Sequence, residues 1–335
     1  NLTDVFQFLD FVALATISDM MPLVGENRLM VFYGLKLLNT TPRIGLRNFI
    51  RSINGVIDES HVSFNIGPRI NAAGRMKNGK IIVNLLIEND PDTANNLSNE
   101  IEFLNQNRRK IEKDVLTQAE MQTDKTSYTN TVYSKDWNKG VLGIVASRLI
   151  ENSYKPTIVM TDFGKDLLTG SVRSVKGFDV YEALTKCTEN IYQFGGHKYA
   201  AGLTLNLNQL DEFKLAFETY TKNHILPEQR EPSLAYDLDI SFSDLNFKLL
   251  RIINQMSPFG PKNMRPVFVT HQCKDFGGSR SVGNDKTHLR LDIIDSTGNR
   301  FSGIGFGMGN YISEVKKKKP FSVLYTLEEN QYNGN

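Results

Sequence analysis

The chain has 335 residues, of which 40% are hydrophobic and 23% are charged. This composition is ordinary for a globular protein, and the length favours two or three domains. The 39 basic and 37 acidic residues leave a formal net charge of +2, so the bulk charge argues neither for nor against a nucleic-acid partner. The sequence has no run of about 18 apolar residues, so a membrane span is not expected.

The two cysteines, Cys187 and Cys273, are not spaced as a pair. A disulfide framework or a structural zinc site is therefore not expected, and a reducing cytoplasm fits best. The sequence starts without methionine or a basic leader and enters an apolar helical pattern directly. We therefore expect that residues precede Asn1, whether they were lost by truncation or by cleavage.

Four segments follow in chain order. Residues 1–90 mix irregular stretches with helical patterns at 8–17 and 28–38. Residues 91–123 predict one long helix with a charged face, a candidate connector between domains. Residues 124–228 alternate strand and helix patterns, with β-prone stretches at 129–134 and 156–161, and predict an α/β domain. Residues 229–335 alternate polar and apolar between glycine-rich turns, which favours a small antiparallel barrel.

Residues 67–75 read GPRINAAGR and form the first candidate site. Glycines and alanines permit close backbone approach, and Arg69 and Arg75 could grip phosphate oxygens in a bidentate manner. The alternative interpretation is a tight helix start whose arginines are solvated.

Residues 170–174 read GSVRS and follow a strand pattern. Their backbone amides, together with the Ser171 hydroxyl and the Arg173 guanidinium, could cradle an anion. An ordinary polar turn is the alternative.

Residues 194–202 read FGGHKYAAG. Gly195 and Gly196 place His197 on a backbone that a ligand can approach closely. The small residues after His197 are expected to belong to a tightly packed helix. A lone histidine is otherwise more often structural.

Asp19, at the end of an apolar run, must be paired or metal-bound if it is buried, and local capping of a helix end is the alternative. Residues 137–148 indicate a loop that enters a helix whose amino end could be functional.

Together these segments resemble, in their order, the RecJ exonucleases of the DHH phosphoesterase superfamily. The matching motifs are ALATISDMMPL at 13–23, residues 67–75, residues 140–148, GSVRS and the FGGHKYAAG segment. The resemblance spans about residues 8–335 and includes the stretch LNQNR at 104–108.

The resemblance implies part of a DHH catalytic domain (1–90), a long connecting helix (91–123), a DHH-associated substrate-binding domain (124–228) and an OB-fold-like nucleic-acid-binding barrel (229–335), which is expected to be truncated. It implies metal-dependent, 5′-to-3′ hydrolysis of single-stranded DNA to mononucleotides in DNA repair and recombination. Two Mn²⁺ or Mg²⁺ ions would serve this reaction. Single-stranded DNA, a single-strand-binding protein and a helicase are the implied partners.

The family's site residues carry over by position. Asp19 matches a metal ligand. Arg69, Asn71 and Arg75 match a motif that contacts the DNA backbone. Ser171 and Arg173 match a pair associated with the 5′-terminal phosphate, and Gly195, Gly196 and His197 match the signature that lines the substrate. Arg173 and His197 would neutralise charge that develops on the phosphate. In the barrel, Phe276, Arg280, His288 and Arg290 are candidates for stacking and backbone contacts with single-stranded DNA.

Two departures from the family pattern stand out. The DHH triplet and the other upstream aspartate motifs are absent, so the chain as given is expected to lack most metal ligands and to be inactive alone. Asn138 stands where family members often carry histidine. A non-catalytic, single-strand-binding scaffold and a phosphodiesterase of short oligonucleotides or cyclic dinucleotides are the alternatives, although the latter enzymes usually end before a barrel.

Overall fold

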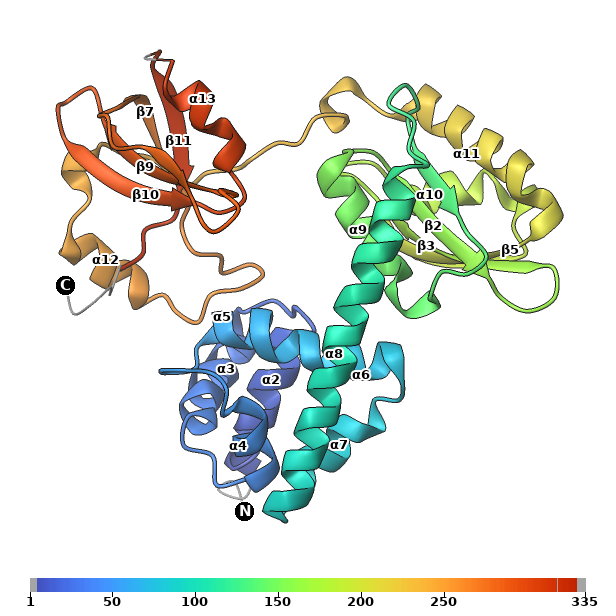
Figure 1. Cartoon of the computed structure of the whole chain (residues 1–335), viewed down its shortest axis with the longest axis horizontal. Helices are drawn as coiled ribbons and strands as arrows, with labels where there is room; N and C mark the ends of the chain where they lie inside the picture. Colours follow the sequence, from blue (N-terminus) through green and yellow to red (C-terminus); the bar gives the residue numbers. More distant parts are fainter. Residues whose placement is uncertain (1–4, 318, 330–335) are drawn as a thin grey trace. The chain divides into compact units, whose positions relative to one another are not determined.

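The computed structural model of the chain describes residues 5–317 and 319–329 (Figure 1). Their internal contacts form two compact units, one comprising Asn1–Asn39, Ile57–Glu59 and Leu234–Asn335, the other Thr40–Val56 and Ser60–Ser233. No described helix is both long enough and apolar enough to span a membrane.

The second unit begins with helices that lead into one long helix. They are α4 (Ile44–Ile50), α5 (Glu59–His61), the π-helical turn η1 (Val62–Ile66), α6 (Gly67–Met76), α7 (Lys80–Ile87) and α8 (Pro91–Glu120). The carboxylate of Asp90 accepts the Thr93 amide at 2.7 Å and so caps α8, and Pro91 takes the first helical position. The expected long helix is therefore confirmed.

A five-stranded sheet follows, with the order β1-β2-β3-β5-β4. Its strands are β1 (Asn130–Tyr133), β2 (Thr157–Asp162), β3 (Leu167–Arg173), β4 (Gln193–His197) and β5 (Ala200–Asn206). Only β1 and β2 pair in parallel. The other elements are η2 (Lys139–Val141), α9 (Leu142–Asn152), α10 (Val180–Thr185), η3 (Thr188–Asn190), η4 (Leu207–Gln209), α11 (Leu210–His224) and η5 (Pro227–Gln229).

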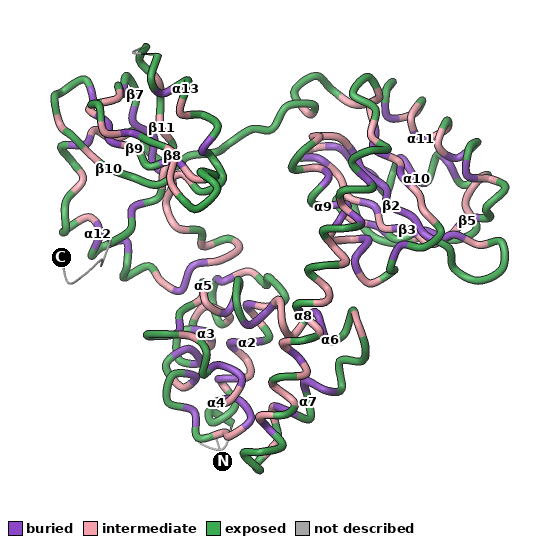
Figure 2. Tube along the Cα trace, viewed as in Figure 1, coloured by how far each residue is buried: buried purple, intermediate pink, exposed green. Residues whose placement is uncertain are grey.

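The two faces of this sheet have different cores. On one face, Val172, Ala201 and Leu203 pack with the buried residues of α10 and α11. On the other face, Val132 and Val159 pack with the apolar sides of α8 and α9. Figure 2 shows the resulting buried stretches along β2 and β3. Alternation along a strand therefore directs successive side chains to opposite faces of the sheet.

The first unit joins two helices, α2 (Leu9–Ser18) and α3 (Gly25–Leu38), to the carboxy-terminal barrel. The barrel sheet has the order β10-β9-β7-β11, with β6 paired to β7 and β8 paired to β9. Its elements are β6 (Leu238–Asp239), η6 (Phe242–Asp244), α12 (Phe247–Asn254), β7 (Phe268–Asp275), β8 (Arg280–Val282), β9 (His288–Ile294), β10 (Arg300–Gly305), η7 (Gly309–Tyr311), α13 (Ile312–Val315) and β11 (Phe321–Tyr325). The predicted fold class, an α/β chain with a long helix and a carboxy-terminal OB-like barrel, is confirmed.

The loop before β7 ties the barrel to α2 and α3. The Leu23 amide donates to the Pro261 carbonyl at 2.7 Å, and Arg28 donates to the Met256 carbonyl at 2.8 Å. The carboxylate of Glu59 accepts the Phe259 amide at 2.9 Å. The barrel and these helices therefore stabilise one another, and removal of the barrel would also strip the helices of partners.

The barrel contains a buried carboxylate whose hydrogen bonds predict acid sensitivity. Burial alone would raise the pKa of Asp295, but donors from Thr297, Asn299, Phe242 and Ser241 outweigh it and lower the pKa to about 2. An unfolded aspartate has a pKa of about 3.9. The stabilisation is therefore present above about pH 4 and is lost as the pH falls through about 2.

We expect Asp295→Asn to lower the free energy of unfolding at pH 7 and to flatten its dependence on pH between about 4 and 2. Urea titrations of both proteins across this pH range measure the effect, with Asp285→Asn as the exposed control. Parallel pH profiles for the wild type and Asp295→Asn would contradict the assignment.

Candidate functional site

The half of the sheet formed by β3, β5 and β4 presents an open face with small residues. Strand register places side chains of one face in two rows, Ser171–Gly202–Gly195 and Arg173–Ala200–His197. Gly195, Gly202 and His197 are exposed, and a Cβ added at Gly195 would meet nothing within 4 Å. The sheet therefore offers a nearly flat floor, flanked by a guanidinium and an imidazole.

The amino end of α9 borders this floor at Gly143. A Cβ at Gly143 would lie 2.8 Å from Nη2 of Arg173 and 3.5 Å from Oγ of Ser171. The first-turn amides of a helix lack intrahelical acceptors and carry partial positive charge. Helix amides, a hydroxyl and a guanidinium thus converge, a combination suited to an anion such as phosphate.

This arrangement differs from the anion cradle expected within residues 170–174. These residues do not form a turn up to Arg173, because β3 runs to Arg173 and pairs with β2 on one side and β5 on the other. The expectation that their own amides bind the anion was wrong, since an inner strand commits its amides to its neighbours. The candidate amides belong instead to the start of α9 after Leu142, whose own amide donates to the Lys139 carbonyl.

Arg75 reaches the same region from the end of α6. Its Nη1 donates to the Gly140 carbonyl at 3.5 Å, and a side chain at Gly140 would collide with the Arg75 carbonyl oxygen. Oδ1 of Asn138 accepts the Gly140 amide at 2.8 Å and caps η2. The asparagine that departs from the family pattern therefore has a structural function, since it shapes the turn against which Arg75 packs.

Arg75 lies within electrostatic reach of both Arg108 and Arg173, and we call these three residues the arginine cluster. Burial lowers the pKa of Arg173, and the charge of Arg75 lowers it further. Partial burial also lowers the pKa of Arg75, as does the charge of Arg108, while the carboxylate of Glu112 opposes both. Guanidinium remains protonated at neutral pH, so the cluster concentrates positive charge that an anion would compensate.

His197 lies on the hairpin between β4 and β5. The Tyr199 amide donates to Nδ1 of His197 at 3.3 Å, so a neutral ring carries its proton on Nε2. Gly196 has a φ of +150°, and a side chain there would overlap Ala200 and Ala201. The small residues after His197 form β5 and not the expected helix, and they extend the floor.

Arg69 and Asn71 are placed differently from Arg75. Arg69 pairs with Glu102 at 3.0 Å and donates to the Phe49 carbonyl at 3.3 Å. Six helical positions separate Arg69 from Arg75, which places them about 120° apart around α6. Asn71 is exposed on the same helix. Contact of Arg69 or Asn71 with DNA stays a prediction, and Arg69 would first have to leave Glu102.

Asp19 is exposed at the carboxy end of α2. Across residues 5–317 and 319–329, no group of three or more histidine, cysteine, aspartate or glutamate side chains could hold a metal ion. A two-metal centre requires several such ligands. The described residues therefore do not fit such a centre, and the role of Asp19 as a ligand stays a prediction.

The barrel gathers the four candidate DNA contacts near one surface. Along β9, His288 and Arg290 point away from the core residues Leu289 and Ile293, and Arg280 of β8 is opposite Arg290. Arg280 and Arg290 line an open pocket of about 400 Å³. Arg300, which also lines it, pairs with Asp292 at 2.6 Å and lies 4.4 Å from the ring centre of Phe276.

Arg108 and Glu112 belong to the charged face of the long helix, and the sequence pattern alone predicts no role for them beyond that face. Their side chains are only 11% and 13% exposed, and they pair at 2.5 Å. Their spacing of four positions is the available signal, since it brings both to one side of a helix. The pattern could not reveal that this side is covered by another element.

The comparisons with known proteins agree with this architecture. Family models match the DHHA1 domain over residues 125–223 and the RecJ OB domain over residues 236–335. The single-stranded-DNA-specific exonuclease RecJ of Bacillus subtilis is 32% identical over 98% of this chain and 42% of its own length. The Haemophilus influenzae RecJ is 30% identical over 100% of this chain and 60% of its own length.

Solved structures give the same result. The RecJ of Thermus thermophilus in complex with Mg²⁺ has a TM-score of 0.85 at 27% identity, over 98% of this chain and 50% of that chain. A manganese-bound exonuclease RecJ has a TM-score of 0.60 at 30% identity, over 68% of this chain and 58% of that chain. The chain spans about half the length of these relatives.

A DHHA1 domain joined to an OB domain, with cationic and hydroxyl donors at a helix start, defines a chain of the DHH class. Within this class the chain belongs to the RecJ family, because the similarity extends over its whole length and includes both domains.

The contact at Gly143 gives a prediction that separates binding from stability. Gly143→Ala should displace the Arg173 guanidinium, because the new Cβ would lie 2.8 Å from Nη2. Affinity for 5′-phosphorylated single strands should fall roughly tenfold, about the effect of one weakened charged hydrogen bond. The thermal midpoint should not fall, because alanine suits a helix better than glycine.

Fluorescence anisotropy with EDTA present and thermal denaturation measure the two effects. Gly79→Ala, at the start of α7, is the matched control. Wild-type affinity in folded Gly143→Ala would show that Arg173 does not need its position against α9.

Proposed function

We propose that this chain serves a metal-dependent exonuclease that degrades single-stranded DNA to mononucleotides from the 5′ end. The observation that carries the proposal is the convergence of Arg173, Ser171 and the first turn of α9, with Arg75 beside them. A terminal phosphomonoester carries up to two negative charges near neutral pH, whereas an internal phosphodiester carries one. Concentrated positive charge therefore favours a strand end over the strand interior.

The chain's own residues bind and orient in this proposal. Arg173 and Ser171 donate to the terminal phosphate, and the floor of Gly195 and Gly202 leaves room for a nucleotide. Nε2–H of His197 is available to a phosphate oxygen next to it. Divalent metal ions in RecJ-type reactions supply an activated water and stabilise the leaving oxygen. Because the described residues do not form such a centre, no step is assigned to them through a metal.

The wider role belongs to the same proposal. It comprises DNA repair and recombination in the cytoplasm, use of Mn²⁺ or Mg²⁺, and association with a single-strand-binding protein and a helicase. Its support is similarity to proteins named single-stranded-DNA-specific exonucleases and to RecJ structures solved with Mg²⁺ and with Mn²⁺.

Arg173→Ala should remove the preference for a 5′-phosphate. Loss of a charged hydrogen-bond donor typically costs about 1.5–3 kcal/mol, so affinity for 5′-phosphorylated strands should fall roughly 10- to 100-fold. Strands with a 5′-hydroxyl should bind almost unchanged. Kd values for both strands, measured in EDTA, test this, and Arg51→Ala removes an exposed guanidinium held by Asn95 as a control.

Three results would redirect the proposal. A wild-type chain that binds both strands equally has no terminal-phosphate site. Phosphate-specific binding without Mn²⁺-dependent release of nucleotides would favour the single-strand-binding scaffold for this chain. Cleavage of dinucleotides in preference to long strands would favour an oligonucleotide phosphodiesterase.

We propose further that the barrel surface around Arg280, His288 and Arg290 holds the strand beyond its 5′ end. Support comes from three exposed arginines, including Arg300, beside the exposed ring of Phe276. Cations track a nucleic-acid backbone, and an exposed ring can stack on bases. Point variants test this better than deletion of the barrel, since the barrel stabilises α2 and α3.

Arg290→Ala should weaken binding of long single strands and lower the slope of log Kd against log salt by about 0.7 for one lost phosphate contact. The preference for a 5′-phosphate should persist, because that site lies on α9 and β3. Salt titrations of affinity measure the slope, with Lys248→Ala on α12 as control. An unchanged slope would remove Arg290 from the DNA contact.

A further inference from the structure

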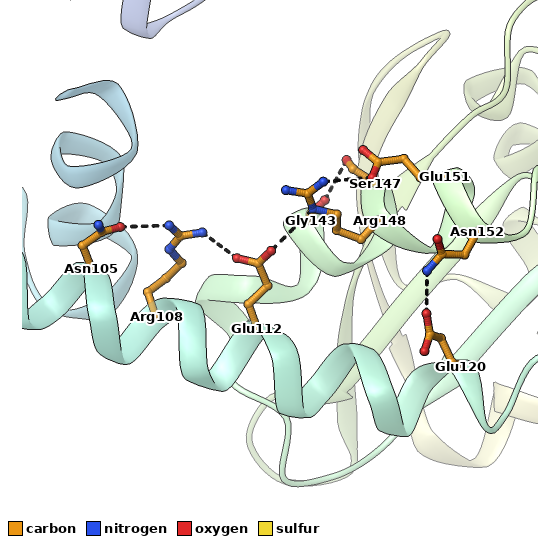
Figure 3. A network of polar contacts seen from close by, with 9 residues as sticks. All are labelled: Asn105, Arg108, Glu112, Glu120, Gly143, Ser147, Arg148, Glu151 and Asn152. Atoms are coloured by element: carbon orange, nitrogen blue, oxygen red, sulfur yellow. Dashed lines mark hydrogen bonds and ion pairs between the residues drawn. The ribbon is translucent and has the colours of Figure 1, made fainter. Parts of the chain in front are cut away.

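A polar network that includes Arg108 of the arginine cluster joins α8 to α9 (Figure 3). Nη1 of Arg108 donates to Glu112 at 2.5 Å, and Nη2 donates to the buried side chain of Asn105 at 2.9 Å. The second carboxylate oxygen of Glu112 lies 3.6 Å from Nε of Arg148 on α9. Arg108 is thus fixed by two side chains of its own helix, and Glu112 extends the network to α9.

The charges in this region do not balance. Arg75, Arg108, Arg148 and Arg173 are cationic, and Glu112 is the carboxylate shared by two of them. Glu151 pairs with Arg148 only at the exposed edge, at 2.9 Å. Across residues 5–317 and 319–329, no carboxylate lies within ion-pair distance of Arg75 or Arg173. Nε of Arg108 is buried and has no hydrogen-bond partner among the same residues.

We propose that Glu112 is a positioning residue that keeps Arg108 away from the terminal phosphate and limits how tightly the arginine cluster holds that phosphate. The inference rests on the proposed function and deepens it. Hydrolysis from a 5′ end leaves a nucleoside 5′-monophosphate, whose phosphate carries the same charge as the strand end. A cluster without an internal counter-ion would therefore retain its product, and Glu112 supplies that counter-ion.

Two physical effects act in the same direction. The negative charge of Glu112 repels a bound phosphate dianion through a partly desolvated region, where screening by water is weak. In addition, the ion pair with Glu112 prevents the Arg108 guanidinium from turning toward the anion. Neutral glutamine keeps the size of the side chain but removes the charge, so both restraints weaken in Glu112→Gln.

The test is affinity measured in EDTA on the full chain, with 5′-phosphorylated and 5′-hydroxyl oligothymidylate labelled at the 3′ end, and competition by thymidine 5′-monophosphate. Glu112→Gln should bind the phosphorylated strand and the monophosphate about fivefold more tightly at low salt, while the hydroxyl strand is unaffected. The gain should be smaller near 1 M salt, where the Debye length is about 3 Å, than at low salt. Glu112→Asp, which keeps the charge, should restore wild-type preference.

Glu120→Gln is the matched control. It alters another carboxylate of α8 that also contacts α9, through Asn152 at 2.5 Å, about 12 Å further along the helix. Glu120→Gln should change the affinity for neither the phosphorylated strand nor the hydroxyl strand. If Glu112→Gln does not fold, Arg148→Gln decides, because it leaves the Glu112 charge less compensated and should weaken binding of the phosphorylated strand alone.

The outcomes separate the two proposals. If Arg173→Ala abolishes phosphate preference but folded Glu112→Gln binds both strands as the wild type does, or weakens both equally, the role of Glu112 is overturned and the proposed function stands. If Arg173→Ala leaves phosphate preference intact, the terminal-phosphate site itself is wrong.

Discussion

The close approach of α9 to β3 is the constraint on which the candidate site depends. Helix amides reach an anion only if the helix start lies beside the other donors, and a side chain at Gly143 would push Arg173 away. The same helix packs its apolar side on β2 and α8 through Val145 and Leu149. Its position is therefore fixed by a buried core on one side, while its amino end remains open. A rigid support under an exposed site is what precise orientation of a phosphate requires.

The two faces of the sheet differ in burial, and so do the two halves of one of these faces. Val172 and Ala201 are committed to the core under α10 and α11, so their neighbours Arg173, Ala200 and Gly202 must face the other way. There, α8 and α9 cover β1 and β2, whereas β3, β5 and β4 keep small residues and polar tips. The glycines that weaken a strand by themselves are tolerated because the other face anchors the sheet. Loss of packing at these positions is what leaves space for a ligand.

Much of this could be predicted from local patterns, and the rest required distant contacts. The long helix follows from Pro91 and a recurring apolar stripe, and β1 and β2 follow from β-prone stretches. The order of the family motifs indicated the fold class. Local reading could not show that Arg173 lies in an inner strand, because a strand and a polar turn share that short sequence. Nor could it separate Arg69 from Arg75, since the difference depends on Glu102, a residue of another helix.

The carboxylates of α8 determine which cations of α6 and of its C-cap residue, Lys77, remain available to an anion. Glu102 pairs with Arg69, and Glu100 pairs with Lys77 at 2.6 Å, so these cations are already compensated when an anion arrives. Arg75, on the same helix, has no such partner within the described residues and meets Arg173 instead. A charged helix face that a sequence pattern assigns to solvent therefore sets the electrostatics of the site, because it neutralises some cations and leaves others exposed to a ligand. Glu112 lies between these two situations, since it pairs directly with Arg108 and acts on Arg75 only from a distance. In the proposed function, such graded compensation would allow strong selection of a terminal phosphate without the retention that a fully unpaired cluster would impose.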